Sequence, residues 1–287
     1  MATKVDLCYT DSTTCDKSKE EKTMIELGKA KREAIQSICQ NSEEVLVRGA
    51  MEGTMGRVFV PKLQNSSYCL IHSGDFAYLL GLPPSGGEGA LNLKALIYEM
   101  CSNDFITPGD ERWAGWIEDE FQGRYRTVTR YALKKDENHF DRAVLEGYRK
   151  NIPDGIRIKK IDERLYHLAL KEEWSRDFCS NFEDENQFMR DGLGFVAMKG
   201  REILAGCSAY GYSSGMMEVE VGTRKDYRRQ GLALACSAAF LLECMDRGIY
   251  PNWNASNEQS VGLAEKLGYV FHREYQVYQL LDTESEE

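Results

Sequence analysis

The sequence has no uncharged apolar run that approaches the ~18 residues of a membrane-spanning helix. Its opening segment, MATKVDLCYTDSTTCDKSKEEK, also lacks the apolar core of a secretory signal. There is no CxxC pair, and the nine cysteines are odd in number and scattered. This pattern argues against a disulfide framework or a cysteine-based zinc site. These absences predict a cytoplasmic protein with reduced cysteines and no membrane partner.

Histidine is scarce, which restricts metal binding. None of the four histidines has a Cys or Glu partner at metal-ligand spacing: His72, His139, His167 and His272. Each is interpreted as a structural or surface residue. The sequence therefore predicts no metal site.

Basic residues are outnumbered by acidic ones. The chain has 36 Lys and Arg against 46 Asp and Glu, which gives a formal net charge of -10. A nucleic-acid partner is disfavoured, because such partners require a basic surface that displaces counterions. An acidic excess mainly serves solubility, and it is compatible with a cationic substrate such as an amine.

The composition that remains is that of a folded protein, with 42% hydrophobic residues, 29% charged residues and only 6 prolines. A length of 287 residues suffices for two cores, because single domains usually span about 100 to 200 residues. The turn chemistry of the segment IPDG, which ends at Gly155, favours a boundary there. We predict a flexible tail over 1–22, an N-terminal α/β domain over 23–153 and a second domain over 154–287.

The first domain is predicted to begin with a helix over residues 23–40. Strand-like runs follow in VLVRGAMEGTMGRVFVPK and SYCLIHSGDFAYLLG, separated by turn residues. Helical spacing in ALNLKALIYEMC and FDRAVLEGYRKN, with the strand RYRTVTRYALKK between them, completes the pattern. This alternation predicts a small α/β domain.

The second domain is predicted to contain the strands GIRIKKID, GFVAMKG, EILAGCSAYGY and MMEVEVGT, with two short helices after the first. A long helix over 230–246, the strand YPNWNA, the helix NEQSVGLAEKLG and a closing strand pair, YVFHRE then YQVYQLLD, follow. This order predicts an α/β (α+β) fold with a mixed, mostly antiparallel sheet flanked by helices. The first domain ends in a similar order, so it is either unrelated or a degenerate copy of the second.

The most informative segment is the strand MMEVEVGT, the turn RKDY and the helix start RRQGLA. The first N–H groups of a helix lack partners within it and lie at the positive end of its dipole, so they can bind a phosphate. Gly231 allows close approach of the backbone, small Ala233 leaves room, and Lys225, Arg228 and Arg229 add positive charge. The pattern predicts an anion site, although one glycine before a helix can also be a simple connection.

Two motifs point to a known superfamily. The pattern R-x-x-G-x-A between a strand and a long helix resembles motif A of the GNAT N-acetyltransferases, and NEQSVGLAEKLGY resembles a later helix of the same superfamily. The segments YRRQGLA, PNWNASNEQSVGLAEKLGY, GDFAYLLG and RYALKK together resemble the two-domain bacterial GNAT family that includes the zwittermicin A resistance acetyltransferase. The resemblance implies a GNAT-type fold and the use of acetyl-CoA.

The resemblance also implies which residues contact acetyl-CoA. The backbone of Val221, Gly222 and Thr223 is assigned to the pantetheine arm, and Asn257 takes the place of an Asn near the thiol. Asn257 is also a good helix N-cap by itself. The pyrophosphate is assigned to the turn, with Arg228 at its Q/R position, followed by Arg229, Gln230, Gly231, Leu232, Ala233 and Leu234.

Two glutamates are the candidate catalytic residues. Strand alternation places Glu218 and Glu220 on one face, beside the predicted coenzyme site. Neighbouring, partly desolvated carboxylates raise one another's pKa toward the range of a general base. We favour Glu220 as the base over Glu218, while binding of a cationic acceptor and simple solvent exposure stay open. Ala264 stands where many GNAT enzymes have the Tyr that protonates the departing thiolate.

The sequence thus predicts an N-acetyltransferase that transfers acetyl from acetyl-CoA to a primary amine of a small molecule, by direct attack in a ternary complex. The N-terminal domain would shape or cover the acceptor site, and a homodimer is compatible with the sequence. Two alternatives stay open. One is a non-catalytic acyl-CoA sensor, and the other is a protein or peptide N-acetyltransferase.

Overall fold

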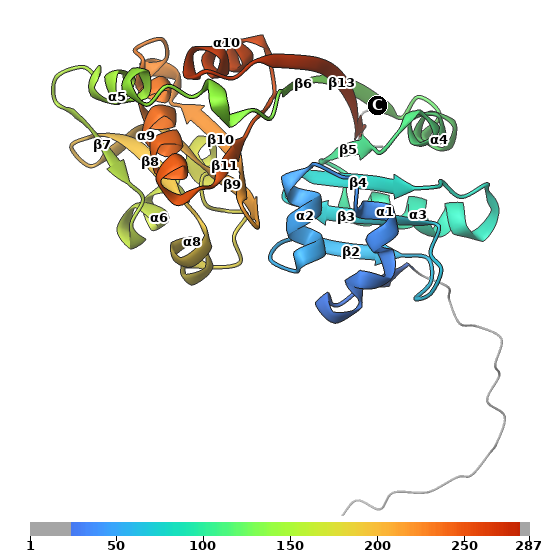
Figure 1. Cartoon of the computed structure of the whole chain (residues 1–287). Coiled ribbons are helices and arrows are strands. Elements are labelled where there is room, and N and C mark those ends of the chain that lie inside the picture. The colour runs from blue at the N-terminus through green and yellow to red at the C-terminus, as the bar shows by residue number, and fades with distance from the viewer. Residues whose placement is uncertain (1–23, 282–287) are drawn as a thin grey trace, which may run out of the picture.

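The computed structural model describes residues 24–281, and the tail predicted over 1–22 lies outside them. Two sheets organise the described residues, with helices packed on their faces (Figure 1). Most strand pairs are antiparallel, and only β4 with β5 and β10 with β11 are parallel among the described residues. The predicted mixed, mostly antiparallel fold is therefore confirmed.

The larger sheet has eight strands in the order β1-β2-β3-β4-β5-β13-β6-β12. Its strands are β1 (Ile25–Glu26), β2 (Arg57–Val60), β3 (Tyr68–Ser73), β4 (Phe76–Gly81), β5 (Phe105–Pro108), β6 (Tyr125–Leu133), β12 (Asn254–Ala255) and β13 (Phe271–Leu280). One face packs against α3 (Gly87–Met100) and α4 (Glu111–Phe121). The other face packs against η1 (Lys29–Ile35), α1 (Gln36–Cys39) and α2 (Val45–Glu52).

The smaller sheet has five strands in the order β11-β10-β9-β8-β7. Its strands are β7 (Ile156–Lys160), β8 (Gly194–Lys199), β9 (Glu202–Ser213), β10 (Met216–Thr223) and β11 (Tyr250–Asn252). The helical segments of this part are η2 (Glu137–His139), α5 (Arg142–Lys150), α6 (Glu163–Ala169), α7 (Glu173–Arg176), α8 (Glu185–Asp191), η3 (Lys225–Tyr227), α9 (Leu232–Arg247) and α10 (Glu258–Leu267). The apolar helix α9 lies in the centre of the core of this part.

The start of the chain departs from the prediction. The run VLVRGAM, predicted as a strand, forms helix α2, and the helix predicted over 23–40 is divided into β1, η1 and α1. Apolar residues at 45, 46, 47 and 50 fit a helical face as well as a short strand, and tertiary contacts decide between helix and strand. Gly49 in α2 packs so closely that an added Cβ would lie 2.4 Å from the carbonyl oxygen of Tyr212.

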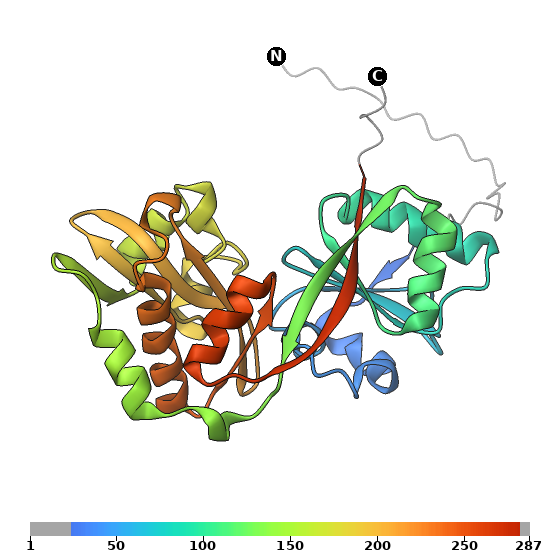
Figure 2. The ribbon, with the colours of Figure 1, turned by 90° about the horizontal axis from the view of Figure 1, so that it is seen from above.

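The two sheets do not correspond to two consecutive parts of the sequence, a first part that forms most of the larger sheet and a second part that forms the smaller sheet. The predicted closing strand pair is one continuous strand, β13, which pairs with β6 and β5 of the larger sheet. β6 and β13 run side by side between the two parts (Figure 2). The core of the second part already includes Leu133, Phe140 and Leu145. The core therefore changes before the boundary predicted near Pro153, and the division into domains stays a prediction.

A glycine at the end of α10 fixes how this helix meets the rest of the core. Gly268 has φ +109, and an added Cβ would lie 2.4 Å from the backbone oxygen of His139. We expect Gly268→Ala to lower the free energy of unfolding by about 2 kcal/mol or more, because backbone strain and steric overlap add. Gly262, inside α10, has open space around it, so Gly262→Ala should be neutral or stabilising. Urea denaturation compares the two, and equal effects would contradict this explanation.

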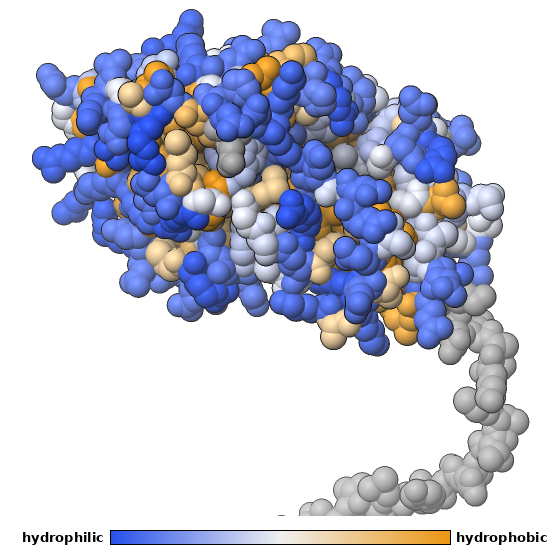
Figure 3. Space-filling view, in the orientation of Figure 1, coloured by the Kyte–Doolittle hydropathy of each residue, from blue (hydrophilic) through white to orange (hydrophobic). Residues whose placement is uncertain are grey.

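The surface is largely polar. The face in Figure 3 is predominantly hydrophilic, with small separated apolar patches. Within residues 24–281, no helix has both the length and the apolar character required to cross a membrane.

Candidate active site

The site begins where two neighbouring strands separate. β10 pairs with β11 in parallel from Met216 to Glu218, and beyond that point β12 pairs with β6 instead. β10 continues to Thr223 with β9 as its partner on the other side. Its second edge is thus open over its last residues, where backbone N–H and C=O groups need partners.

A cavity of about 1240 Å³ occupies this opening. The residues predicted to contact the coenzyme line it with one exception: Val221, Gly222, Thr223, Arg228, Arg229, Gly231, Leu232, Ala233, Leu234 and Asn257. Gln230 is not among the lining residues, and its Nε2 donates to the backbone oxygen of Asp226 at 3.4 Å. Ser260, three residues after Asn257, also lines the cavity. The structure therefore brings together residues from β10, α9 and α10.

The turn before α9 has an unusual backbone. Arg229 has φ 60 and Gly231 has φ 78, so two residues of RRQG adopt the left-handed conformation. Such a turn directs successive backbone N–H groups toward one side and forms an anion-binding concavity. Since α9 begins at Leu232, its first amides have no acceptor within the helix. Strained backbone of this kind is common at functional sites.

Asn257 is both the N-cap of α10 and a lining residue of the cavity. Its Oδ1 accepts from the backbone N–H of Ser260 at 2.9 Å, which caps α10, and the residue lines the cavity. Ala264 is fully buried in the core of this part and does not line the cavity. The position of the usual Tyr therefore carries no proton donor here.

Glu218 is firmly held. It is 8% exposed, and its carboxylate accepts hydrogen bonds from Asn252 Nδ2 at 2.6 Å and from Asn254 N and Nδ2 at 3.2 Å each. Burial raises the pKa of Glu218 to about 7, and the charge of Glu44 adds to this rise. The two Asn donors and Arg130 act in the opposite direction.

Glu220 faces the same cavity in a different environment. Burial raises the pKa of Glu220 to about 8, and the charges of Asp177 and Asp75 add to this rise. Arg130 and the backbone N–H of Val221 oppose it. A carboxyl group that titrates near neutral pH can accept a proton and release it again, as a general base requires.

The raised pKa of Glu220 predicts a cost in stability. The folded protein holds the proton more tightly than the unfolded chain, so rising pH lowers the free energy of unfolding between about pH 4.5 and pH 8. Glu220→Gln has no titrating group at this position. At pH 8 its free energy of unfolding should exceed that of the wild type by on the order of 1 kcal/mol. Thermal denaturation at pH 5 and pH 8 checks this. A difference between the two proteins that does not grow with pH would contradict the assignment.

The opposite end of the cavity is lined mainly by residues that the sequence did not reveal. The first part contributes Leu46, Asp75, Phe76, Tyr78, Phe105 and Arg130, and the second part contributes Asp177, Tyr210 and Tyr275. These residues come from separate elements, so no local spacing could have identified them. Tyr275 lies here because β13, at the end of the described chain, joins the larger sheet.

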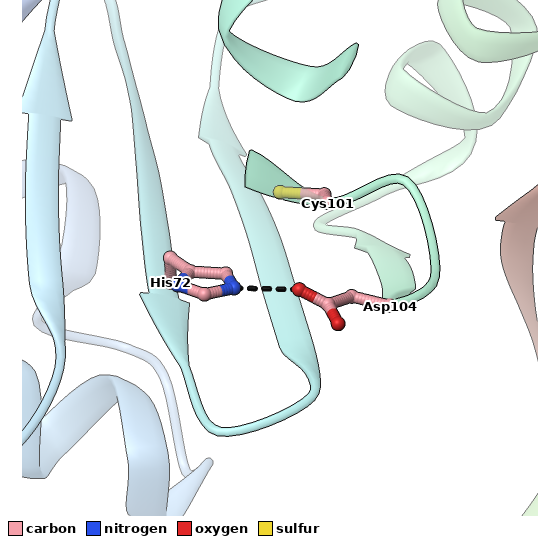
Figure 4. Close-up of side chains that lie close together, drawn as sticks. All are labelled: His72, Cys101 and Asp104. Atoms are coloured by element: carbon pink, nitrogen blue, oxygen red, sulfur yellow. Dashed lines mark hydrogen bonds and ion pairs between the residues drawn. The ribbon is translucent and has the colours of Figure 1, made fainter. Parts of the chain in front are cut away.

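One polar cluster lies away from this cavity. Ligand atoms of His72, Cys101 and Asp104 lie within 4.8 Å of one another (Figure 4). His72 Nε2 and Asp104 Oδ2 are 2.6 Å apart, whereas two atoms that share a tetrahedral zinc ion lie about 3.3 Å apart. Burial raises the pKa of the Cys101 thiol to about 12. The arrangement is a His–Asp hydrogen bond beside a protonated thiol, which fits a structural role for His72.

The separated strands and the left-handed turn into α9 define the N-acetyltransferase class that the sequence resembles. Residues 36–278 match the sequence model of the family described as GNAT acetyltransferase, and the chain belongs to this family. A crystal structure of a GCN5-related N-acetyltransferase-like protein from Streptococcus suis is 35% identical. It superposes with a TM-score of 0.79 over 88% of this chain and 100% of that one. The protein is thus an enzyme of the N-acetyltransferase type.

Two further relatives are more distant. An uncharacterized N-acetyltransferase of Bacillus subtilis, YdfB, is 28% identical over 53% of this chain, and the chain spans 61% of that relative. A tandem GNAT protein from the clavulanic acid biosynthesis pathway has a TM-score of 0.57 over 89% of this chain and 97% of that one. At 9% identity that likeness concerns the fold alone. The resemblance to the two-domain family of zwittermicin A resistance stays a prediction.

Proposed function

We propose that the enzyme transfers acetyl from acetyl-CoA to a primary amine of a small molecule, by direct attack in a ternary complex. One observation carries this proposal. A single cavity joins the backbone of β10 and the turn into α9 to an acidic and aromatic end that contains Glu218 and Glu220. Donor and acceptor can therefore meet beside a base.

The donor end fits a pyrophosphate and its pantetheine arm. The turn supplies backbone N–H groups, and Lys225, Arg228 and Arg229 add charge beside them. The edge of β10 at Val221 to Thr223 has no strand partner among the described residues, so backbone groups there suit the amides of pantetheine. A backbone N–H near Val221 is the candidate donor to the oxyanion.

The acceptor end suits a cationic amine. Alkylammonium groups have a pKa near ~10, so the acceptor arrives protonated and must lose a proton before it attacks. Carboxylates attract the ammonium form, and Glu220 then accepts the proton directly or through water. Since the position of the usual Tyr holds buried Ala264, solvent in the cavity is the proposed proton source for the departing thiolate.

The shape of the acceptor end favours a small molecule. Its wall is built by both parts of the chain, with Phe76 and Phe105 from the first and Tyr210 from the second. The backbone N–H of Asp75 donates to the hydroxyl of Tyr210 at 2.7 Å, which ties the two parts together here. Because both parts of the chain line the acceptor end, a small molecule is the proposed acceptor, and a peptide is the alternative that an amine screen distinguishes.

Two measurements test this function. Calorimetric titration with acetyl-CoA reports donor binding, and thiol release during a screen of small amines and lysine-containing peptides reports turnover. We expect binding together with turnover of small amines. Donor binding without turnover of any amine would favour the acyl-CoA sensor, and turnover of peptides alone would favour a protein N-acetyltransferase.

A further inference from the structure

Arg130 lies in an unusual place for a cation. It comes from β6 in the larger sheet, yet it lines the same cavity as Glu218 and Glu220 on β10 of the smaller sheet. The other lining cations, Lys225, Arg228, Arg229 and Lys266, belong to the donor end and to α10. Arg130 is therefore the cation that the first part of the chain contributes to the acceptor end.

Several contacts hold the guanidinium in place. Its Nη2 donates to the backbone oxygen of Asn254 at 3.1 Å, and its Cζ lies 4.9 Å and 5.5 Å from the ring centroids of Phe76 and Phe105. Asn254 in turn donates to Oε1 of Glu218. The Nε of Arg130 is buried and has no hydrogen-bond partner among the described residues. Aromatic rings, a carbonyl oxygen and the side chain of Tyr275 thus set its position, and residues 24–281 provide no direct ion pair.

The surroundings of Arg130 carry an excess of negative charge. Five carboxyl groups gather at this end of the cavity or next to it: Glu44, Asp75, Asp177, Glu218 and Glu220. Asp75 and Asp177 act on Glu220, and Glu44 acts on Glu218. Like charges that are partly desolvated disfavour one another's ionised form. Without a compensating cation, the group that must accept a proton would ionise only at still higher pH.

Arg130 acts on both members of the glutamate pair. Its charge lowers the pKa of Glu218 and Glu220 against the effect of burial, and it does the same for Glu44 and Tyr275. Lys135 and Arg273 also lower the pKa of Glu44, but Arg130 is the cation that acts on both catalytic candidates.

We propose that Arg130 is a positioning residue through which the first part of the chain favours the ionised form of Glu220. This inference rests on the proposed function, in which Glu220 is the base. It gives the first part a chemical role beyond covering the acceptor site. The strand that carries the base and the strand that carries its counter-charge belong to different sheets, so this effect depends on how the two sheets are placed relative to one another.

A direct titration tests the inference without any turnover. Carbon NMR of protein labelled at the glutamate carboxyl carbons follows each group, and Glu220→Gln identifies the signal of Glu220. Arg130→Met should move the midpoint of Glu220 to higher pH by about one pH unit, because an opposite charge is removed. Arg130→Lys keeps the positive charge, so its Glu220 midpoint should lie close to that of the wild type. Arg126→Met is the matched control, since Arg126 is an exposed Arg of the same strand.

Kinetics provide a second readout. In Arg130→Met the acid limb of kcat/KM should move to higher pH with the NMR midpoint, while the Kd for acetyl-CoA stays within a few-fold. Arg130→Gln serves the same purpose if the Met variant does not fold. An unmoved midpoint in a folded Met or Gln variant would overturn the role of Arg130. A wild-type protein that binds acetyl-CoA and acetylates no amine would instead overturn the proposed function.

Discussion

Gly231→Glu is expected to abolish the binding of acetyl-CoA in a protein that still folds. Gly231 lines the cavity at the N-cap of α9, and an added Cβ would meet no atom within 4 Å. The variant therefore causes no overlap within the protein. It places a carboxylate where the turn directs its N–H groups, and a negative charge about 4 Å from a phosphate costs about 4 kcal/mol at an effective dielectric constant of about 20. We expect a loss of affinity of at least about 100-fold.

The same helix offers a matched control at its other end. Gly248 caps α9, has φ +65, is exposed and also has open space around its Cα. Gly248→Glu thus adds the same charge and the same backbone strain, far from the donor end of the cavity. Both variants should lose similar stability in thermal denaturation, and only Gly231→Glu should lose calorimetric binding. Normal affinity in folded Gly231→Glu would contradict the placement of the pyrophosphate.

The donor end could be predicted from the sequence because its chemistry is local. A strand, a turn and a helix start follow one another directly, and the backbone conformation of Gly231 and its neighbours is set by a few consecutive residues. Gln230 shows the limit of this reasoning. It lies within the motif, yet the left-handed residues on either side turn its side chain away from the cavity, toward Asp226.

The acceptor end could not be predicted because it depends on long-range pairing. Arg130 reaches the cavity since β6 pairs with β13 and β12, which are separated from it by the whole of the smaller sheet in the sequence. Helix α2 was mistaken for a strand for a related reason. Over a short run, its apolar residues fit both the helical and the strand periodicity. The close contact of Gly49 with Tyr212 is visible only in the folded chain.

The second large effect is expected for Glu220→Gln. If Glu220 is the base, the variant should lower kcat by about 10²- to 10⁴-fold, the usual contribution of general base catalysis. The Gln side chain keeps the size of the residue, so the Kd for acetyl-CoA should stay within a few-fold. In the wild type, kcat/KM should fall as pH falls below about 8, because protonated Glu220 cannot accept a proton. Steady-state rates between pH 6 and pH 9.5 provide the measurement.

Glu218→Gln separates the two glutamates. Glu218 accepts three hydrogen bonds from Asn252 and Asn254, so its carboxylate is already engaged and is less available to an incoming proton. Glu218→Gln should lower the free energy of unfolding, because the Asn donors lose a charged acceptor. The acid limb of its kcat/KM profile near pH 8 should remain. If the limb instead persists in Glu220→Gln and disappears in Glu218→Gln, the base is Glu218, with its pKa of about 7. The position of the surviving limb therefore identifies the base even where both variants lose rate.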